Sequence, residues 1–252
     1  MKDAYEQEQS LQDYAGAPHN KGTLALVFTD IVGSTELNNH FGDDEWLAIL
    51  LQHFDRARRL IEDHHGYLIK FIGDSCMVAF RTTADAFRFS LEFFADTGHE
   101  YLTIRAAIHF GGVLIVDNDT YGSMVNRTAR IQHSVEGWGI AMSDSAYRDV
   151  IFVLGRSAPE MTAKRTTPRL KGFPIEAVWQ ITTKEMRIAA EGRRQTRRRA
   201  GVPKPQSLQT FTAPVQPPSN QTAPLAPHPS DRSNRISDLR RVYIPPTGDD
   251  KK

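Results

Sequence analysis

LVFTDIVGST, residues 26–35, is the stretch on which the fold of this chain depends. The apolar residues 24–28 predict a buried β-strand, and this strand leads into Asp30. Gly33 and two hydroxyl residues then predict the start of a helix, where backbone N–H groups without partners form a site suited to phosphate. We therefore expect a carboxylate and a phosphate-binding turn to meet at one end of a strand.

Strand and helix patterns alternate along the chain beyond this stretch. Apolar residues at helical spacing predict an amphipathic helix over 43–64, and two β-rich runs broken by GDS predict a hairpin over 66–80. A second helix follows Thr83, and a strand is expected over 102–116. The order β-α-β-β-α-β predicts an α+β, ferredoxin-like fold, an antiparallel sheet with helices on one face. Further expected elements are a helix at 122–134, a strand at 139–143, a short helix at 143–151 and a strand within 170–181.

Composition narrows the cellular setting. The chain has 252 residues and a net charge of +1, so no global field favours nucleic acid or membrane. The single cysteine, Cys76, excludes an internal disulfide and favours a reducing compartment. No apolar run approaches the roughly 18 residues of a transmembrane helix. We therefore expect a cytoplasmic protein with no transmembrane segment.

Composition also divides the chain into three parts. Residues 1–20 are polar and predict a flexible N-terminal segment, and residues 21–184 predict the folded domain. Residues 185–252 are expected to be an Arg-rich junction and a Pro-rich disordered tail, because ten of the 14 prolines lie after residue 200. The six arginines within 187–199 predict either a solvated junction or a tether to an anionic partner, such as nucleic acid or an anionic surface.

Two aspartates are expected to converge in this topology. Asp30 ends the first strand and Asp74 lies at the turn of the hairpin, and these two ends can lie side by side. Two adjacent carboxylates repel each other unless a cation joins them, and oxygen ligands suit a hard divalent ion. The alternative is that each aspartate is an ordinary turn or capping residue.

Five stretches together resemble the catalytic domain of class III nucleotidyl cyclases, the adenylyl and guanylyl cyclases. They occur in family order between residues 28 and 181, and the FTDIxGST opening resembles that of bacterial adenylyl cyclases. The matching stretches are FTDIVGST, IKFIGDSCMVAF, IRAAIHFGGV, DTYGSMVNRTARI and LKGFPIEAVWQI.

The resemblance implies a role for each matching position. Two Mg²⁺ or Mn²⁺ ions would be held by Asp30, Asp74 and the carbonyl oxygen of Ile31. Lys70 and Asp119 match the pair that reads the base. The phosphate-binding segment matches Val32, Gly33, Ser34 and Thr35.

The resemblance also implies a homodimer whose active site is shared. Asn126 would orient the ribose and Arg130 would stabilise the transition state, four residues apart on one helix face. Thr128 stands between them where the family has a small alanine. The segment 113–119 is shorter than the arm that many members wrap around the partner, so specific activity should rise with protein concentration. One subunit would supply the metal ligands, and the other would supply Lys70, Asp119, Asn126 and Arg130.

The expected activity is an adenylyl cyclase that converts ATP to 3′,5′-cyclic AMP and pyrophosphate. Lys70 only donates hydrogen bonds and an ionised Asp119 only accepts them, which complements N1 and N6 of adenine and opposes the order in guanine. Cytosine presents the same order as adenine, so a cyclase of CTP stays open, as does one of GTP. A third reading is a catalytically silent nucleotide-binding or scaffold protein.

Overall fold

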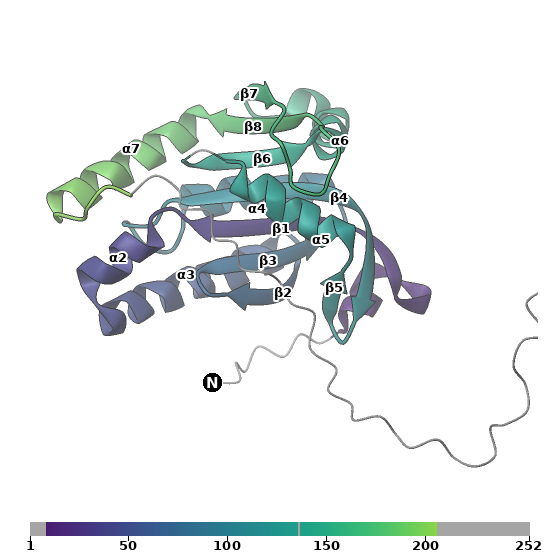
Figure 1. Ribbon diagram of the computed structural model, residues 1–252, viewed down its shortest axis with the longest axis horizontal. Helices are drawn as coiled ribbons and strands as arrows, with labels where there is room; N and C mark the ends of the chain where they lie inside the picture. The colour runs from purple at the N-terminus through teal and green to yellow at the C-terminus, as the bar shows by residue number, and fades with distance from the viewer. Residues whose placement is uncertain (1–8, 136, 206–252) are drawn as a thin grey trace, which may run out of the picture. The chain divides into compact units, whose positions relative to one another are not determined.

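The computed structural model describes residues 9–135 and 137–205, which are built around one β-sheet (Figure 1). Its strands are β1 (Lys21–Ile31), β2 (Tyr67–Ile72), β3 (Ser75–Phe80), β4 (Ile104–Val116), β5 (Asp119–Tyr121), β6 (Gly139–Ser143), β7 (Met161–Thr166) and β8 (Val178–Thr183). The strand order is β2-β3-β1-β4-β6-β8-β7, and β5 pairs with the end of β4. The strand expected within 170–181 begins only at Val178, and β7 was not predicted.

The first four strands form the predicted ferredoxin-like core. β1 pairs antiparallel with both β3 and β4, and β2 pairs antiparallel with β3, which gives the order β2-β3-β1-β4. β6 extends this sheet by pairing parallel to β4. The α+β class is confirmed, and the sheet is antiparallel in its core but mixed as a whole.

The helices are α1 (Leu11–Ala15), α2 (Ser34–Phe41), α3 (Asp43–Asp63), α4 (Thr83–Ala95), α5 (Ser123–His133), α6 (Asp144–Leu154) and α7 (Lys184–Arg199), with 3₁₀ turns at Pro18–Asn20 and Gly155–Ser157. Side chains of β1 alternate between two cores because successive residues of a strand face opposite sides. Ala25 and Val27 join the main core with α3, α4, α6 and α7, whereas Leu24 and Leu26 join a second core with α1 and α5. The prediction that helices cover one face is thus correct for α3 and α4, whereas α5 packs on the opposite face (Figure 1).

The N-terminal segment is more ordered than the sequence predicted. Ser10 caps α1 by accepting a hydrogen bond from the N–H of Asp13, and Leu11 and Tyr14 are buried against the sheet. The Tyr14 hydroxyl donates to the carbonyl of His65 at 2.7 Å. The prediction of a flexible segment is therefore wrong for residues 9–20, and residues 1–8 lie outside the described part.

The predicted boundary at residue 184 is also wrong, because α7 continues the folded unit. Thr183 caps its start, and Met186 and Ala190 are buried in the main core. The helix ends at Arg199, and two residues later the φ of 75° at Gly201 is suited to glycine; the Val202 N–H donates to the carbonyl of Arg197 at 2.9 Å. The rest of the predicted Pro-rich tail, residues 206–252, lies outside the described part. None of the helices described here is both long enough and apolar enough to cross a bilayer.

Candidate active site

Asp30 is fixed from two sides at the end of β1. The Ser75 hydroxyl donates to Asp30 Oδ1 at 2.9 Å, and Arg105 donates from Nε and Nη2 to Oδ2 at 2.8 and 2.5 Å. Arg105 stands directly opposite Asp30 in the β1–β4 register, which explains its reach. Each carboxylate oxygen can accept a further bond, so this arrangement orients Asp30 and leaves it able to bind a cation.

Asp74, in the turn between β2 and β3, is half-buried, and one of its carboxylate oxygens lacks a partner. Burial and then the negative charge of Asp30 raise the pKa of Asp74, while hydrogen bonds from the Ser34 hydroxyl and the Ile31 N–H act in the opposite direction. Its Oδ2 atom is buried and has no hydrogen-bond partner among the described residues. A buried carboxylate oxygen without a partner costs free energy unless a cation or a donor reaches it.

These observations fit the metal site that the resemblance implies. Asp30 and Asp74 meet as predicted, and the orphaned oxygen of Asp74 supplies an open ligand position. Within residues 9–135 and 137–205, no group of three His, Cys, Asp or Glu side chains could hold a metal ion. Further ligands would therefore be the main-chain carbonyl of Ile31 and oxygens of the substrate, which are the hard ligands that Mg²⁺ takes.

The turn that the sequence predicts to bind phosphate follows Asp30 directly. Gly33 has a φ of 72°, which turns the chain from β1 into α2. The Val32 N–H donates to the carbonyl of Thr103 at 2.8 Å, which fixes the turn to the start of β4. The first N–H groups of α2, from Ser34 onward, have no partner within the helix. Ser34 is half-buried and Thr35 is exposed, so the turn offers backbone donors at the surface.

Lys70 and Asp119 form an ion pair. The two residues assigned to recognise one base therefore lie next to each other. Lys70 Nζ donates to Asp119 Oδ2, and Asp119 Oδ1 accepts from the Thr120 N–H at 2.8 Å. β4 and β5 form a hairpin that brings Asp119 beside β2. An ammonium group has three donors, so Lys70 retains hydrogen-bonding capacity for a ligand.

Asn126 and Arg130 lie one turn apart on α5 without internal partners. Neither side chain makes a hydrogen bond or ion pair with another residue of the described part; Asn126 is exposed and Arg130 is half-buried. Thr128, between them, is buried, and its hydroxyl donates to the carbonyl of Met124 at 2.9 Å. The extra hydroxyl at this position is thus satisfied inside α5 and leaves the exposed face unchanged.

The predicted residues therefore form two groups within one chain. We call Asp30, Asp74 and the following turn the carboxylate half, and the other group, Lys70, Asp119, Asn126 and Arg130, the base half. No hydrogen bond or ion pair joins the halves among the described residues. Sequence reasoning missed Ser75 and Arg105; Arg105 could have been suspected as the one charged side chain within the apolar run 102–110.

Comparison with known proteins places this geometry in a family. Residues 17–172 match the model of the adenylate and guanylate cyclase catalytic domain. A protein named adenylate cyclase from Streptomyces coelicolor is 25% identical over 171 residues, covering 62% of this chain and 44% of that protein. An adenylate cyclase from Podospora anserina is 27% identical over 167 residues, covering 54% of this chain and 8% of that protein. The chain thus matches less than half the length of either relative.

Solved structures share the fold. The adenylyl cyclase CyaB from P. aeruginosa superposes with a TM-score of 0.56 at 20% identity, covering 65% of this chain and 95% of that one. Adenylate cyclases from Trypanosoma brucei, solved in their monomeric state, give 0.57 at 23% identity, covering 66% of this chain and 92% of that one. The family match over most of the described residues decides the assignment: this chain belongs to the adenylate and guanylate cyclase catalytic domain family.

Proposed function

We propose that the protein is an adenylyl cyclase that converts ATP to 3′,5′-cyclic AMP and pyrophosphate as a homodimer. The observation that supports this most strongly is the carboxylate half. Asp30 and Asp74 meet beside a turn that leads into the N-terminus of α2, and a buried oxygen of Asp74 has no partner among the described residues. The cytoplasmic setting expected from the single cysteine is part of the same proposal.

Divalent cations bound by Asp30, Asp74 and the Ile31 carbonyl would lower the pKa of the ribose 3′-hydroxyl and neutralise phosphate charge. The protein's own contribution begins with the turn after β1. Gly33 and the start of α2 would hold the triphosphate, because a helix N-terminus favours an anion. Arg105 and Ser75 fix the orientation of the Asp30 carboxylate beside that turn.

Cyclisation forms a bond between the ribose O3′ and the α-phosphorus and breaks the bond to the pyrophosphate oxygen. The proton of the 3′-hydroxyl leaves to solvent, and no side chain is assigned as its base. Negative charge grows on the phosphate oxygens, where the guanidinium of Arg130 can donate paired hydrogen bonds. Asn126, one helical turn away, would hold the ribose so that O3′ faces the phosphorus.

A second copy of the chain would bring the two halves together. Asn126 and Arg130 have side chains without partners, which is the expected state of residues that act on a substrate bound to the other subunit. The neighbouring β4–β5 hairpin exposes the apolar side chains Leu114, Val116 and Tyr121. Burying such side chains against a partner would favour dimerisation.

The base preference rests on the Lys70–Asp119 pair. Lys70 can donate to N1 of adenine while Asp119 accepts from the N6 amino group. Guanine presents these groups in the opposite order, so GTP should bind with unpaired polar groups. Cytosine presents the adenine order, and therefore CTP is the competing substrate that must be tested beside ATP.

The test is to incubate the purified full chain with ATP, GTP, CTP or UTP, with Mg²⁺ or Mn²⁺, and to identify products by mass spectrometry. We expect cyclic AMP and pyrophosphate from ATP at the highest kcat/KM. Faster turnover of CTP would identify CTP as the substrate and leave the proposed cyclisation chemistry unchanged. If no nucleotide is cyclised over a range of protein concentrations that includes proven dimers, the enzymatic proposal is wrong.

A further inference from the structure

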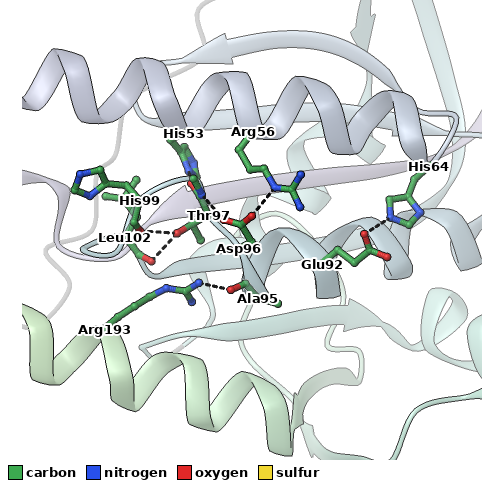
Figure 2. A network of polar contacts seen from close by, with 11 residues as sticks. His53, Arg56, His64, Glu92, Ala95, Asp96, Thr97, His99, Leu102 and Arg193 are labelled. Atoms are coloured by element: carbon green, nitrogen blue, oxygen red, sulfur yellow. Dashed lines mark hydrogen bonds and ion pairs between the residues drawn. The ribbon is translucent and has the colours of Figure 1, made fainter.

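Two buried arginines of α7 bind backbone carbonyls at different places. Arg193 and Arg197 are each only 9% exposed. Arg193 donates to the carbonyls of Phe94 and Ala95 at 2.7 and 2.6 Å, where it caps the C-terminus of α4 (Figure 2). Helix ends leave such carbonyls unpaired, so Arg193 has a complete structural role.

Arg197, one turn later, reaches the phosphate-binding turn itself. Its Nε donates to the carbonyl of Tyr101 at 2.5 Å, and its Nη1 donates to the carbonyl of Val32 at 2.9 Å. Val32 lies between Ile31 and Gly33, so this bond fixes the backbone that joins the proposed metal ligand to the turn. The C-terminal helix thus contacts the backbone of the carboxylate half directly through Arg197.

The chain that follows α7 packs on the same turn. A side chain at Gly33 would place its Cβ 2.9 Å from Cγ of Pro205 and 3.4 Å from Nη1 of Arg197. Val202 is buried in the main core and directs the chain back toward Gly33. The turn is therefore closely packed from behind by residues 197–205.

Arg197 also keeps a positive charge beneath the turn. Both of its acceptors are neutral carbonyl oxygens, and its Nη2 atom is buried with no hydrogen-bond partner among the described residues. Burial and then the charge of Arg193 lower the pKa of Arg197 to about 10, while Glu36 acts in the opposite direction. The guanidinium therefore remains charged at neutral pH.

We propose that Arg197 is a positioning residue for the triphosphate: it fixes the Val32–Gly33 turn and adds positive charge behind it, so that α7 sets the affinity for the substrate's phosphates. This inference rests on the proposed function. It also gives the Arg-rich stretch a role inside the molecule, because Arg193 and Arg197 point into the fold. Arg187, Arg194, Arg198 and Arg199 remain on the exposed side of α7, where the expected anionic partner would have to bind.

The test compares Arg197→Gln with Arg193→Gln, a matched control of equal burial that does not touch the turn. For both full-length variants we would measure thermal unfolding, kcat and KM for ATP, and the dissociation constants of Mg²⁺-tripolyphosphate and adenosine. Both substitutions should lower the unfolding temperature. Only Arg197→Gln should weaken tripolyphosphate binding and raise KM, by about tenfold or more for a lost charge at a phosphate site. Adenosine binding should stay within about twofold, because nothing at the base changes.

Arg197→Lys keeps the charge but cannot span both carbonyls. Its tripolyphosphate affinity and its KM should therefore lie between those of wild type and Arg197→Gln. If Arg197→Gln does not fold, Arg197→Lys replaces it as the test variant, and Arg193→Lys is then the control. Equal tripolyphosphate affinities in the Arg197 and Arg193 variants would overturn the inference, as would a wild-type chain that binds no tripolyphosphate. If wild type forms no cyclic nucleotide but the Arg197 variants alone lose tripolyphosphate binding, the positioning role stands and the cyclase proposal fails.

Discussion

The carboxylate half and the base half of this chain differ in which groups have no partner and in how exposed those groups are. In the carboxylate half, two half-buried acids lie together, Asp30 is oriented by Arg105 and Ser75, and one oxygen of Asp74 has no partner among the described residues. In the base half, the acid is already paired with Lys70, and the side chains without partners are exposed on α5. The first half therefore offers an unpaired oxygen to a cation, and the second offers exposed side chains to a substrate.

This difference indicates how one gene product could build a composite site. A half-buried pair of acids such as Asp30 and Asp74 is costly in a chain by itself, because partial desolvation and mutual repulsion disfavour the charged forms. Exposed polar residues such as Asn126 and Arg130 cost little while they remain solvated. Only the carboxylate half should therefore have a stability that responds strongly to its own charges, whereas loss of the base half should be visible chiefly in turnover.

The largest effect is expected from Asp74→Asn. Turnover should fall by about 1,000-fold or more, because metal-ion catalysis contributes several kcal/mol. The fold should persist, since the substitution removes a buried charge and keeps the shape. Steady-state kinetics beside circular dichroism would check this. Ser75→Ala, which removes one hydrogen bond to Asp30, is the control and should cost far less activity. A folded Asp74→Asn variant with a tenth of wild-type activity would contradict a metal-binding role.

Arg130→Lys should follow, with kcat lowered by about 100-fold and little change in KM. A lysine keeps the charge but loses the paired donors that meet the growing phosphate charge. Arg127→Lys is the matched control on α5, because Arg127 pairs with Glu176 and stacks on Phe173. That variant should lose stability and keep its kcat. A change in KM alone for Arg130→Lys would assign Arg130 to ground-state binding.

Asp119→Ala should produce a smaller effect that is confined to the base. We expect kcat/KM for ATP to fall. The corresponding loss of transition-state stabilisation should be about 1–3 kcal/mol, the value of a hydrogen bond to a charged group. Combining Lys70→Glu with Asp119→Cys reverses the donor and acceptor order, and should narrow the preference for ATP over GTP. Asp117→Asn, in the same hairpin, is the control. If the ratio of kcat/KM between ATP and GTP does not move in any of these variants, the pair does not read the base.

The smallest effect concerns the Thr97–Thr103 loop, whose last residue accepts a hydrogen bond from the Val32 N–H of the carboxylate half. His53 donates from Nδ1 to the carbonyl of Thr97 at 2.7 Å, and its buried Nε2 has no partner among the described residues (Figure 2). Burial lowers the pKa of His53 to about 4. An unfolded histidine binds a proton near pH 6.5, so the unfolded state takes up more protons as the pH falls from 6.5 to 4.

His53 should therefore reduce the free energy of unfolding by about 2 kcal/mol between pH 7 and pH 5. Urea unfolding of wild type and His53→Gln at both pH values isolates this contribution. Hydrogen exchange at pH 5 should rise first in residues 28–35, because the Thr97–Thr103 loop holds Val32. Equal pH dependence in wild type and His53→Gln would show that His53 does not titrate on unfolding.

Much of the core and both halves could be predicted because their signals are local. Asp30 ends an apolar run, Asp74 follows a hairpin glycine, and four residues separate Asn126 from Arg130. The Asp30–Arg105 pair was missed because it depends on strand register, which places Arg105 opposite Asp30 from a distant part of the chain. A lone charge in an apolar strand is the signal that could have found it.

The C-terminal helix was missed for a different physical reason. An Arg-rich run suggests a solvated surface, yet a guanidinium can be buried when carbonyl oxygens satisfy its donors, as at Arg193 and Arg197. The pattern was present in the sequence. Met186 and Ala190 continue the spacing of these two arginines along one helix face, and Gly201 marks the stop.

The central claim is that the two halves meet only between two chains, and mixing two inactive variants tests it most directly. Asp74→Asn destroys the carboxylate half and Arg130→Ala destroys the base half, so each homodimer should be inactive. A heterodimer contains one site with both halves intact, and an equal mixture should therefore recover roughly a quarter of wild-type activity. No recovery, with heterodimers proven by native mass spectrometry, would place the whole active site within one chain and contradict the account.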